Sequence, residues 1–163
     1  MIITTSRRPH TRSRVLCKEL ERVIPLSLYI VRGKKGMRDL FSLSVEKGAD
    51  RLLIVTSQKE PMMSLRFYEE WAFLGELSIS VQLRRELGIP PLMKIRGDPP
   101  LLLKSSEEDA EKIASFFGAL CSQEQAEVWM GYKDHCIDFY RSAISQKWVG
   151  PRLQVRALHE HHH

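Results

Sequence analysis

Several features that would assign this 163-residue chain to a chemical class are missing from its sequence. It has three cysteines, Cys17, Cys121 and Cys136, and no C-x-x-C pair, which argues against a disulfide framework and a structural zinc site. No stretch approaches the roughly 18 uninterrupted apolar residues of a membrane span, and residues 1–5 are too short for the apolar core of a secretion signal. We therefore expect an intracellular protein without a membrane partner, cytoplasmic or, in a eukaryotic source, nucleolar, whose cysteines are reduced and mostly packed.

Sequence motifs of nucleotide, metal and hydrolytic chemistry are also missing. There is no G-x-S-x-G, H-E-x-x-H or G-x-G-x-x-G, and the nearest approach to a phosphate-binding P-loop, residues 33–36, lacks both its spacing and its Ser or Thr. That stretch is a basic turn, which either stays solvated or contacts a phosphate backbone. Cys136 adjoins His135, but neighbours on a strand point to opposite faces, so a packed cysteine is favoured over a nucleophile. We expect no enzyme activity, cofactor, metal or small-molecule substrate.

Positive charge is concentrated at one end of the chain. The net charge is +5, but residues 1–38 carry ten Lys or Arg against Glu19 and Glu21, a net of +8, whereas residues 39–163 have a net charge of −3. Such asymmetry indicates a polyanionic partner, nucleic acid or an anionic membrane, more than a uniformly basic surface would. The ten are Arg7, Arg8, Arg12, Arg14, Lys18, Arg22, Arg32, Lys34, Lys35 and Arg38.

The hydrophobic pattern of the first half predicts the order β-α-β-α-β. Residues 2–5 form a β-prone run, and residues 14–24 have amphipathic helical spacing, with Thr11 or Ser13 as N-cap and Pro25 ending the helix. A second strand over 28–31, a helix over 37–45 ended by Gly48, and a central strand over 52–55 follow. Two alternating segments, 63–67 and 77–83, predict half-buried antiparallel strands.

The second half is predicted to begin after a proline-containing turn near residue 90 and to have its own helix. Ser105 and Glu108 have capping-box spacing at the start of an apolar pattern that continues to residue 120. Strands are expected over 128–132, 137–141 and 153–157, with turns around Asp134 and at 150–151. The prediction is one α/β domain over 1–158, with halves of about 1–88 and 89–158, and a His-rich tail or tag remnant over 159–163.

Aromatic and acidic residues are predicted to have structural roles. Trp71, Trp129 and Trp148 are scattered and no RNP1 signature is present, so packing in a core or interface is favoured over base stacking. A cluster of acids over 107–111 stands at a predicted helix start, which favours interaction with the helix dipole over acid-base catalysis.

The N-terminal segment resembles the opening of Brix-domain proteins, close to their archaeal Imp4-like branch. The resemblance is carried by Ile2-Ile3-Thr4-Thr5-Ser6-Arg7-Arg8-Pro9 and the following residues 11–20, and more weakly by the Arg32-Gly33 turn, residues 52–55, 75–87 and 149–153. It implies two similar α/β halves, each resembling the anticodon-binding domain of class IIa aminoacyl-tRNA synthetases. It also implies a ribosome biogenesis factor of the small subunit that binds pre-rRNA or guide RNA, with pre-ribosomal proteins as further partners and no catalysis.

Charge and resemblance together predict an RNA-binding surface at the N-terminal strand-turn-helix unit. Arginine's planar fork suits phosphate, and counterion release makes such binding depend on salt. An alternative is a tRNA-binding or protein-interaction adaptor with an anticodon-binding-like fold. The predicted RNA-binding residues are Arg7, Arg8, Arg12, Arg14, Lys18, Arg22, Arg32, Lys34 and Lys35, with Arg84, Arg85, Arg152 and Arg156 as weaker candidates.

Overall fold

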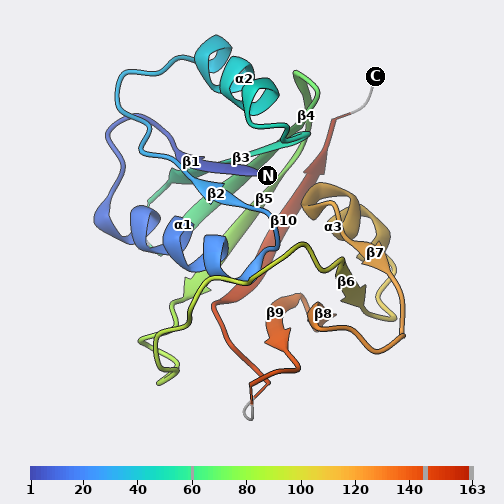
Figure 1. Cartoon of the computed structure of the whole chain (residues 1–163). Helices are drawn as coiled ribbons and strands as arrows, with labels where there is room; N and C mark the ends of the chain where they lie inside the picture. The colour runs from blue at the N-terminus through green and yellow to red at the C-terminus, as the bar shows by residue number, and fades with distance from the viewer. Residues whose placement is uncertain (60, 145–146, 162–163) are drawn as a thin grey trace.

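All strands described by the computed structural model, which covers residues 1–59, 61–144 and 147–161, belong to one mixed sheet. Within these residues the sheet has ten strands in the order β2-β1-β3-β4-β5-β10-β9-β8-β6-β7 (Figure 1). The predicted α/β class is confirmed.

The first half follows the predicted order of elements. Its central strand β1 lies between two parallel neighbours, β2 and β3, and is buried on both faces because α1 and α2 pack on opposite sides of it. The strand predicted over 28–31 is shorter, since it is an edge strand that pairs only with the first residues of β1. The elements are β1 Ile2–Thr5, α1 Thr11–Val23, β2 Leu28–Tyr29, α2 Met37–Glu46, β3 Arg51–Ser57, β4 Met62–Glu69 and β5 Ala72–Gln82.

Helices α1 and α2 cover opposite faces of this half-sheet (Figure 1). Leu16 and Leu20 of α1 pack into the large core with Ile3 and Leu53, and that core continues into the second half. Leu40 of α2 packs on the other face in a smaller cluster that contains Ile2, Leu52 and Ile54. The loop after β1 therefore leads to one face and the loop after β2 to the other, so the carboxyl ends of the parallel strands β2, β1 and β3 form a topological switch point.

The second half repeats the strand pairing of the first without a counterpart of α2 among the described residues. Its central strand β6 lies between parallel β7 and β8, and antiparallel β9 and β10 follow, as β4 and β5 follow β3. Helix α3 packs Ile113 and Phe117 into the same large core as α1. The elements are β6 Leu101–Lys104, α3 Ala110–Phe117, β7 Leu120–Cys121, β8 Val128–Lys133, β9 Cys136–Arg141 and β10 Arg152–Glu160.

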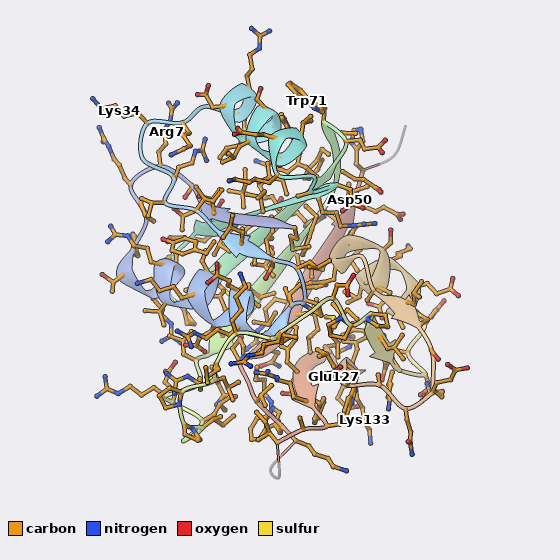
Figure 2. All side chains as sticks on the ribbon, in the orientation of Figure 1. Arg7, Lys34, Asp50, Trp71, Glu127 and Lys133 are labelled. Atoms are coloured by element: carbon orange, nitrogen blue, oxygen red, sulfur yellow. The ribbon has the colours of Figure 1, made fainter. Side chains whose placement is uncertain are left out.

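The two halves join side by side through antiparallel pairing of β5 with β10. Five antiparallel steps separate β3 from β8, so the parallel strands of the two halves run in opposite directions. Their carboxyl ends consequently lie at opposite edges of the sheet. Figure 2 shows Arg7 and Lys34 near one edge and Lys133 near the other.

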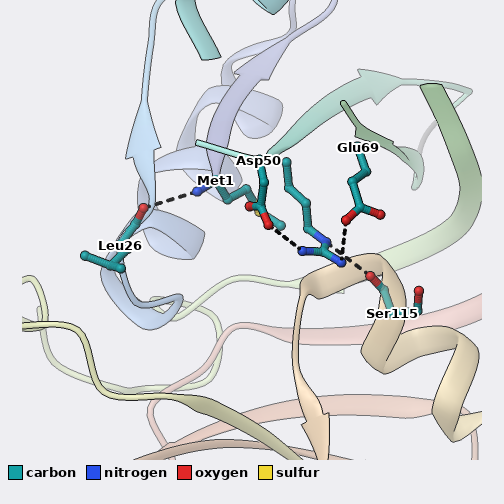
Figure 3. A network of polar contacts seen from close by, with 6 residues as sticks. Met1, Leu26, Asp50, Glu69 and Ser115 are labelled. Atoms are coloured by element: carbon teal, nitrogen blue, oxygen red, sulfur yellow. Dashed lines mark hydrogen bonds and ion pairs between the residues drawn. The ribbon is translucent and has the colours of Figure 1, made fainter. Parts of the chain in front are cut away.

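Arg51 at the start of β3 connects the halves on the side of α3 (Figure 3). Its guanidinium lies 3.1 Å from a carboxylate oxygen of Asp50 and 3.5 Å from one of Glu69, and its Nε donates to the carbonyl of Ser115 in α3 at 3.2 Å. The side chain is 17% exposed, so these contacts are only partly screened by water.

Two predicted helix caps are wrong. Helix α1 begins at Thr11 with His10 in the cap position, and Ser13 is buried and contacts the hydroxyl of Ser57 instead of capping. Helix α3 begins five residues after Ser105, whose hydroxyl donates to the carbonyl of Tyr132 at 2.5 Å because it follows β6 directly.

Some side chains that we expected to be packed are on the surface. Trp71 is 52% exposed at the turn between β4 and β5, and Trp129 and Trp148 are half-buried. Cys17 is buried, and burial raises the pKa of its thiol to about 12, but Cys121 is exposed. His135 is in the turn before β9 and is not a strand neighbour of Cys136.

The C-terminal strand extends into the predicted tail. Strand β10 includes His159 and Glu160, the first residues of that tail, whereas residues 162–163 lie outside the described part of the chain. In the described ranges, none of the helices has the length and hydropathy needed to cross a membrane.

Candidate nucleic-acid interface

Five basic residues gather at the carboxyl ends of β1 and β2, on the loops that enter α1 and α2. We call this group the cationic edge; it consists of Arg7, Arg8, Arg32, Lys34 and Lys35. The chain turns sharply here, because Arg8 adopts a left-handed conformation with φ of +55° and directs the following residues into α1. Arg7 and Lys34, 27 positions apart in the sequence, lie close together in Figure 2.

Arg32 is the structural support of the cationic edge. It is only 9% exposed; its Nε donates to the Lys35 carbonyl at 2.7 Å and its Nη1 to the Thr5 carbonyl at 3.1 Å. These bonds tie the loop after β2 to the end of β1. Burial lowers the pKa of the Arg32 guanidinium, and the nearby charge of Arg7 lowers it further.

Arg7, Arg8 and Lys34 are exposed, and in the described residues their side chains have neither a hydrogen bond nor an ion pair. A Cβ atom on Gly36 would lie 3.7 Å from Nη2 of Arg7 and 3.8 Å from Oδ2 of Asp39, so both side chains lie beside this glycine. Asp39 already accepts from the backbone N–H of Gly36 at 2.9 Å. Like charges held together with so little compensation favour binding of an anion.

The exposed side of α1 extends this positive surface. Arg14 and Lys18 are exposed and free of intramolecular polar partners within the described ranges, and Arg22 is exposed but donates to the carbonyl of Leu92. We call Arg14, Lys18 and Arg22 the α1 ridge; their four-residue spacing places them on the side of the helix opposite Leu16 and Leu20.

Other predicted residues are engaged within the protein. Arg12 lies 2.8 Å from Glu86 and donates to the Val81 carbonyl at 2.6 Å. Arg84 donates to the Ile89 carbonyl at 2.8 Å. Arg12 thus holds the segment after β5 against α1, together with Glu19, which accepts from the Arg84 backbone N–H at 2.7 Å, while Arg85 is exposed on that segment.

Arg152 and Arg156 lie apart from the cationic edge. Arg152 forms an ion pair with Asp138 at 2.9 Å and its guanidinium stacks 4.7 Å above the ring of Trp148. Its neighbour Leu153 packs in the large core, so Arg152 projects from the sheet face opposite α1. Arg156 donates to the hydroxyl of Ser80 at 3.2 Å.

Two basic residues outside the predicted set lie beside the cationic edge. Arg38 is exposed in the first turn of α2, and Lys59 is exposed just beyond the carboxyl end of β3. The signal that identifies them is positional, because both follow the ends of the parallel strands at the switch point. Among the described residues, no group of His, Cys, Asp or Glu is arranged to hold a metal ion.

Comparison with known proteins identifies archaeal relatives. No family model matches the chain. The chain is 35% identical, over an alignment of 170 positions, to the probable Brix domain-containing ribosomal biogenesis protein of Aeropyrum pernix, covering 94% of the chain and 93% of that protein. It is 41% identical over 112 residues to the protein of the same name from Pyrococcus horikoshii, covering 66% of the chain and 50% of that protein. The matched region thus spans about half the length of the Pyrococcus relatives.

Solved structures agree with the sequence comparison. The crystal structure of a probable ribosomal biogenesis protein from A. pernix superimposes with a TM-score of 0.80 at 25% identity, covering 99% of this chain and 96% of that chain. Mil, an archaeal Imp4-like protein, shares the fold with a TM-score of 0.72 at 17% identity, covering 99% of this chain and 100% of that chain.

Proposed function

Because the chain belongs to the Brix-domain family of ribosomal biogenesis proteins, we propose that it binds precursor ribosomal RNA through the cationic edge and the α1 ridge. The observation that carries this proposal is the group of exposed cations, Arg7, Arg8 and Lys34, without intramolecular partners in the described ranges. They stand at the switch point of a parallel half-sheet, where ligands of α/β folds bind. Small-subunit assembly, an intracellular location and the absence of catalysis are parts of the same proposal.

Each group of basic residues has a distinct role in the proposed interface. Arg7, Arg8 and Lys34 contact phosphates directly, and Arg14, Lys18 and Arg22 continue the contact along α1. Arg32 and Arg12 act by positioning, since they fix the loop after β2 and the segment after β5. We propose a weaker contribution from Arg85, and from Lys35, whose ammonium donates to the Val31 carbonyl at 3.2 Å. The engaged Arg84, Arg152 and Arg156 are secondary candidates.

A second candidate function is an adaptor for tRNA or for proteins, built on halves that resemble anticodon-binding domains. It is favoured by the repeated strand pairing of the two halves, each with a helix packed after its first strand. Guide RNA and pre-ribosomal proteins belong to the same set of proposed partners.

The test is a competition between RNAs at several salt concentrations. The full chain is titrated against transcribed fragments of an archaeal pre-rRNA and against tRNA of equal length, from low to high salt. The proposal expects binding that weakens steeply with salt and a preference for pre-rRNA. Equal affinity for both RNAs would favour the adaptor, and binding that does not depend on salt, or no binding, would contradict both.

A further inference from the structure

The two halves differ in what covers the sheet face opposite α1 and α3. The strand registers pair Ile2 with Leu52 and Leu52 with Tyr68 in the first half. In the second half, Leu102 pairs with Trp129 and Trp129 with Tyr140 in the same topological positions.

Helix α2 covers this face only in the first half. There Leu40 packs against Ile2, Leu52 and Ile54, and Phe41 meets Tyr68 edge to face at 5.5 Å between ring centroids. In the second half, residues 122–127 connect β7 to β8 without a helix. The corresponding face over β6, β8 and β9, which we call the bare face, therefore has no covering helix in the described part of the chain.

The residues of the bare face form a row of rings and cations. Trp129 and Tyr140 stack nearly parallel, with 5.3 Å between ring centroids and 8° between planes, and Nζ of Lys104 lies 4.5 Å above the Trp129 ring. Tyr140 lies over Gly131, where a Cβ atom would come within 3.1 Å of the Tyr140 ring. Gly131 thus makes room for this ring.

A hollow of about 400 Å³ opens beside this row, at the carboxyl ends of β6 and β8. Its lining includes Lys104, Gln123, Lys133, Cys136 and Tyr140. Pockets of about 300–1,000 Å³ hold small organic ligands, so one nucleotide fits this volume. The hollow occupies the place in the second half that the switch point occupies in the first.

The hollow can accept a phosphate without repulsion from its own carboxylate. Asp138 is in the lining, but it already accepts from Nε of Arg152 at 2.9 Å and from the indole N–H of Trp148 at 3.0 Å. The ammonium groups of Lys104 and Lys133 therefore determine the sign of the charge that the hollow favours.

The floor suits a nucleotide better than an apolar helix. The positions of Thr4 and Ile54, which pair in the first half, correspond by register to Lys104 and Gly131 in the second. The apolar contact that Ile54 gives to the first half is thus missing, and an ammonium group stands beside the space. Aromatic rings flanked by cations are the combination that binds unpaired bases, which stack on the rings while the cations hold the phosphates.

We propose that this hollow binds an unpaired nucleotide of RNA, with its base stacked on the Tyr140 ring and its phosphate held by Lys104 and Lys133. The proposal rests on the proposed RNA-binding function and adds a contact that depends on bases, on the other half of the molecule. Trp129, for which the sequence favoured packing over base stacking, supports the Tyr140 ring by stacking on it.

The test compares two short single-stranded probes of equal length and charge, oligoadenylate and an abasic ribose-phosphate chain. Oligoadenylate is expected to bind at least about 10-fold more tightly, and Tyr140→Leu to reduce the affinity for it about 5- to 100-fold with an unchanged salt slope. Tyr140→Phe keeps the ring and should keep the affinity. Trp71→Leu is the matched control, because this exposed ring lies on the other half.

A second measurement does not depend on a substitution in the hollow. In a Cys121→Ser background, oligoadenylate should slow alkylation of Cys136, which lines the hollow, while Cys17 is buried. Equal affinity for both probes, or unprotected Cys136 at saturating oligoadenylate, would overturn the proposal. If both probes still bind with steep salt dependence, the cationic edge remains supported, so failure of the two proposals is distinguishable.

Discussion

Replacing Arg7 and Lys34 together by alanine should weaken RNA binding and reduce the dependence of the affinity on salt concentration. Both side chains are exposed and free of intramolecular polar partners in the described ranges, so the double variant should fold with a free energy of unfolding within about 1 kcal/mol of the parent. Removing one phosphate contact lowers the slope of log K against log salt by about 0.7 for a single strand and about 0.9 for a duplex. Removing two should therefore lower it by about 1.4–1.8.

That change in slope converts directly into affinity. If the two proteins bind equally at about 1 M salt, a slope difference of about 1.5 makes the variant about 30-fold weaker at about 0.1 M salt. Filter binding or fluorescence anisotropy over a salt series measures both quantities with one pre-rRNA fragment.

The matched control is Lys47→Ala/Lys112→Ala, which removes the same charge far from the cationic edge. Lys47 follows the C-terminal end of α2, and Lys112 is on α3 and lies 3.3 Å from Glu160. The control should keep the parent slope within about 0.3. Identical slopes for the two double variants would refute our assignment, because binding would then depend on total charge and not on the cationic edge.

Three further predictions concern stability. Burial raises the pKa of Glu19 above 4.5, against the opposing effects of the hydrogen bond from the Arg84 N–H and the Arg84 charge. The stability that the protonated carboxyl contributes is therefore complete below pH 4.5 and is lost as pH rises through the raised value. Glu19→Gln should remove the fall in unfolding free energy with pH, because the amide oxygen still accepts from the Arg84 N–H, whereas Glu19→Ala should cost about 1–3 kcal/mol by leaving that N–H unpaired. Urea melts from about pH 4 to about pH 8 measure this, and an unfolding free energy that falls with pH equally in the parent and in Glu19→Gln would contradict it. Arg51→Ala should cost about 1–2 kcal/mol by releasing α3 from β3, with the exposed Arg38→Ala as a near-neutral control in the same melts. Gly75→Ala should cost about 1–3 kcal/mol, because its Cβ would lie 2.5 Å from the carbonyl oxygen of His159 and from the Phe116 ring. Gly36→Ala, whose nearest neighbour would lie at 3.7 Å, should unfold near the parent temperature, and equal melting temperatures for both glycine variants would contradict this explanation.

The elements of the first half could be predicted because their patterns are local. Helices α1 and α2 have an apolar side spaced at 3–4 residues, and β3, β4 and β5 have continuous or alternating apolar residues. Strands β6 and β7 were missed. Residues 101–103 form a short leucine run after two prolines, and their strand character depends on pairing with β8, which is distant in sequence.

The composition of the candidate site was only partly predictable. A run of arginines shows where charge is concentrated but not which side chains have partners, since Glu86 and Asp138 pair with Arg12 and Arg152 through tertiary contacts. Arg7, Arg8 and Lys34 remain exposed, which sequence spacing alone could not distinguish. The row formed by Trp129 and Tyr140 was missed for a related reason. Both residues alternate with core residues, and whether their face is covered depends on the absence of a helix from 122–127.

Pairing of β5 with β10 fixes the distance and orientation between the two halves. A hinge motion between the halves would require breaking the backbone hydrogen bonds between β5 and β10. This pairing runs from Arg152 opposite Gln82 to Glu160 opposite Gly75. The cationic edge and the hollow are therefore held at opposite edges of one stiff sheet. An RNA that reached both would have to cross the sheet obliquely, so the protein would select among RNA conformations by span and direction as well as by local contacts.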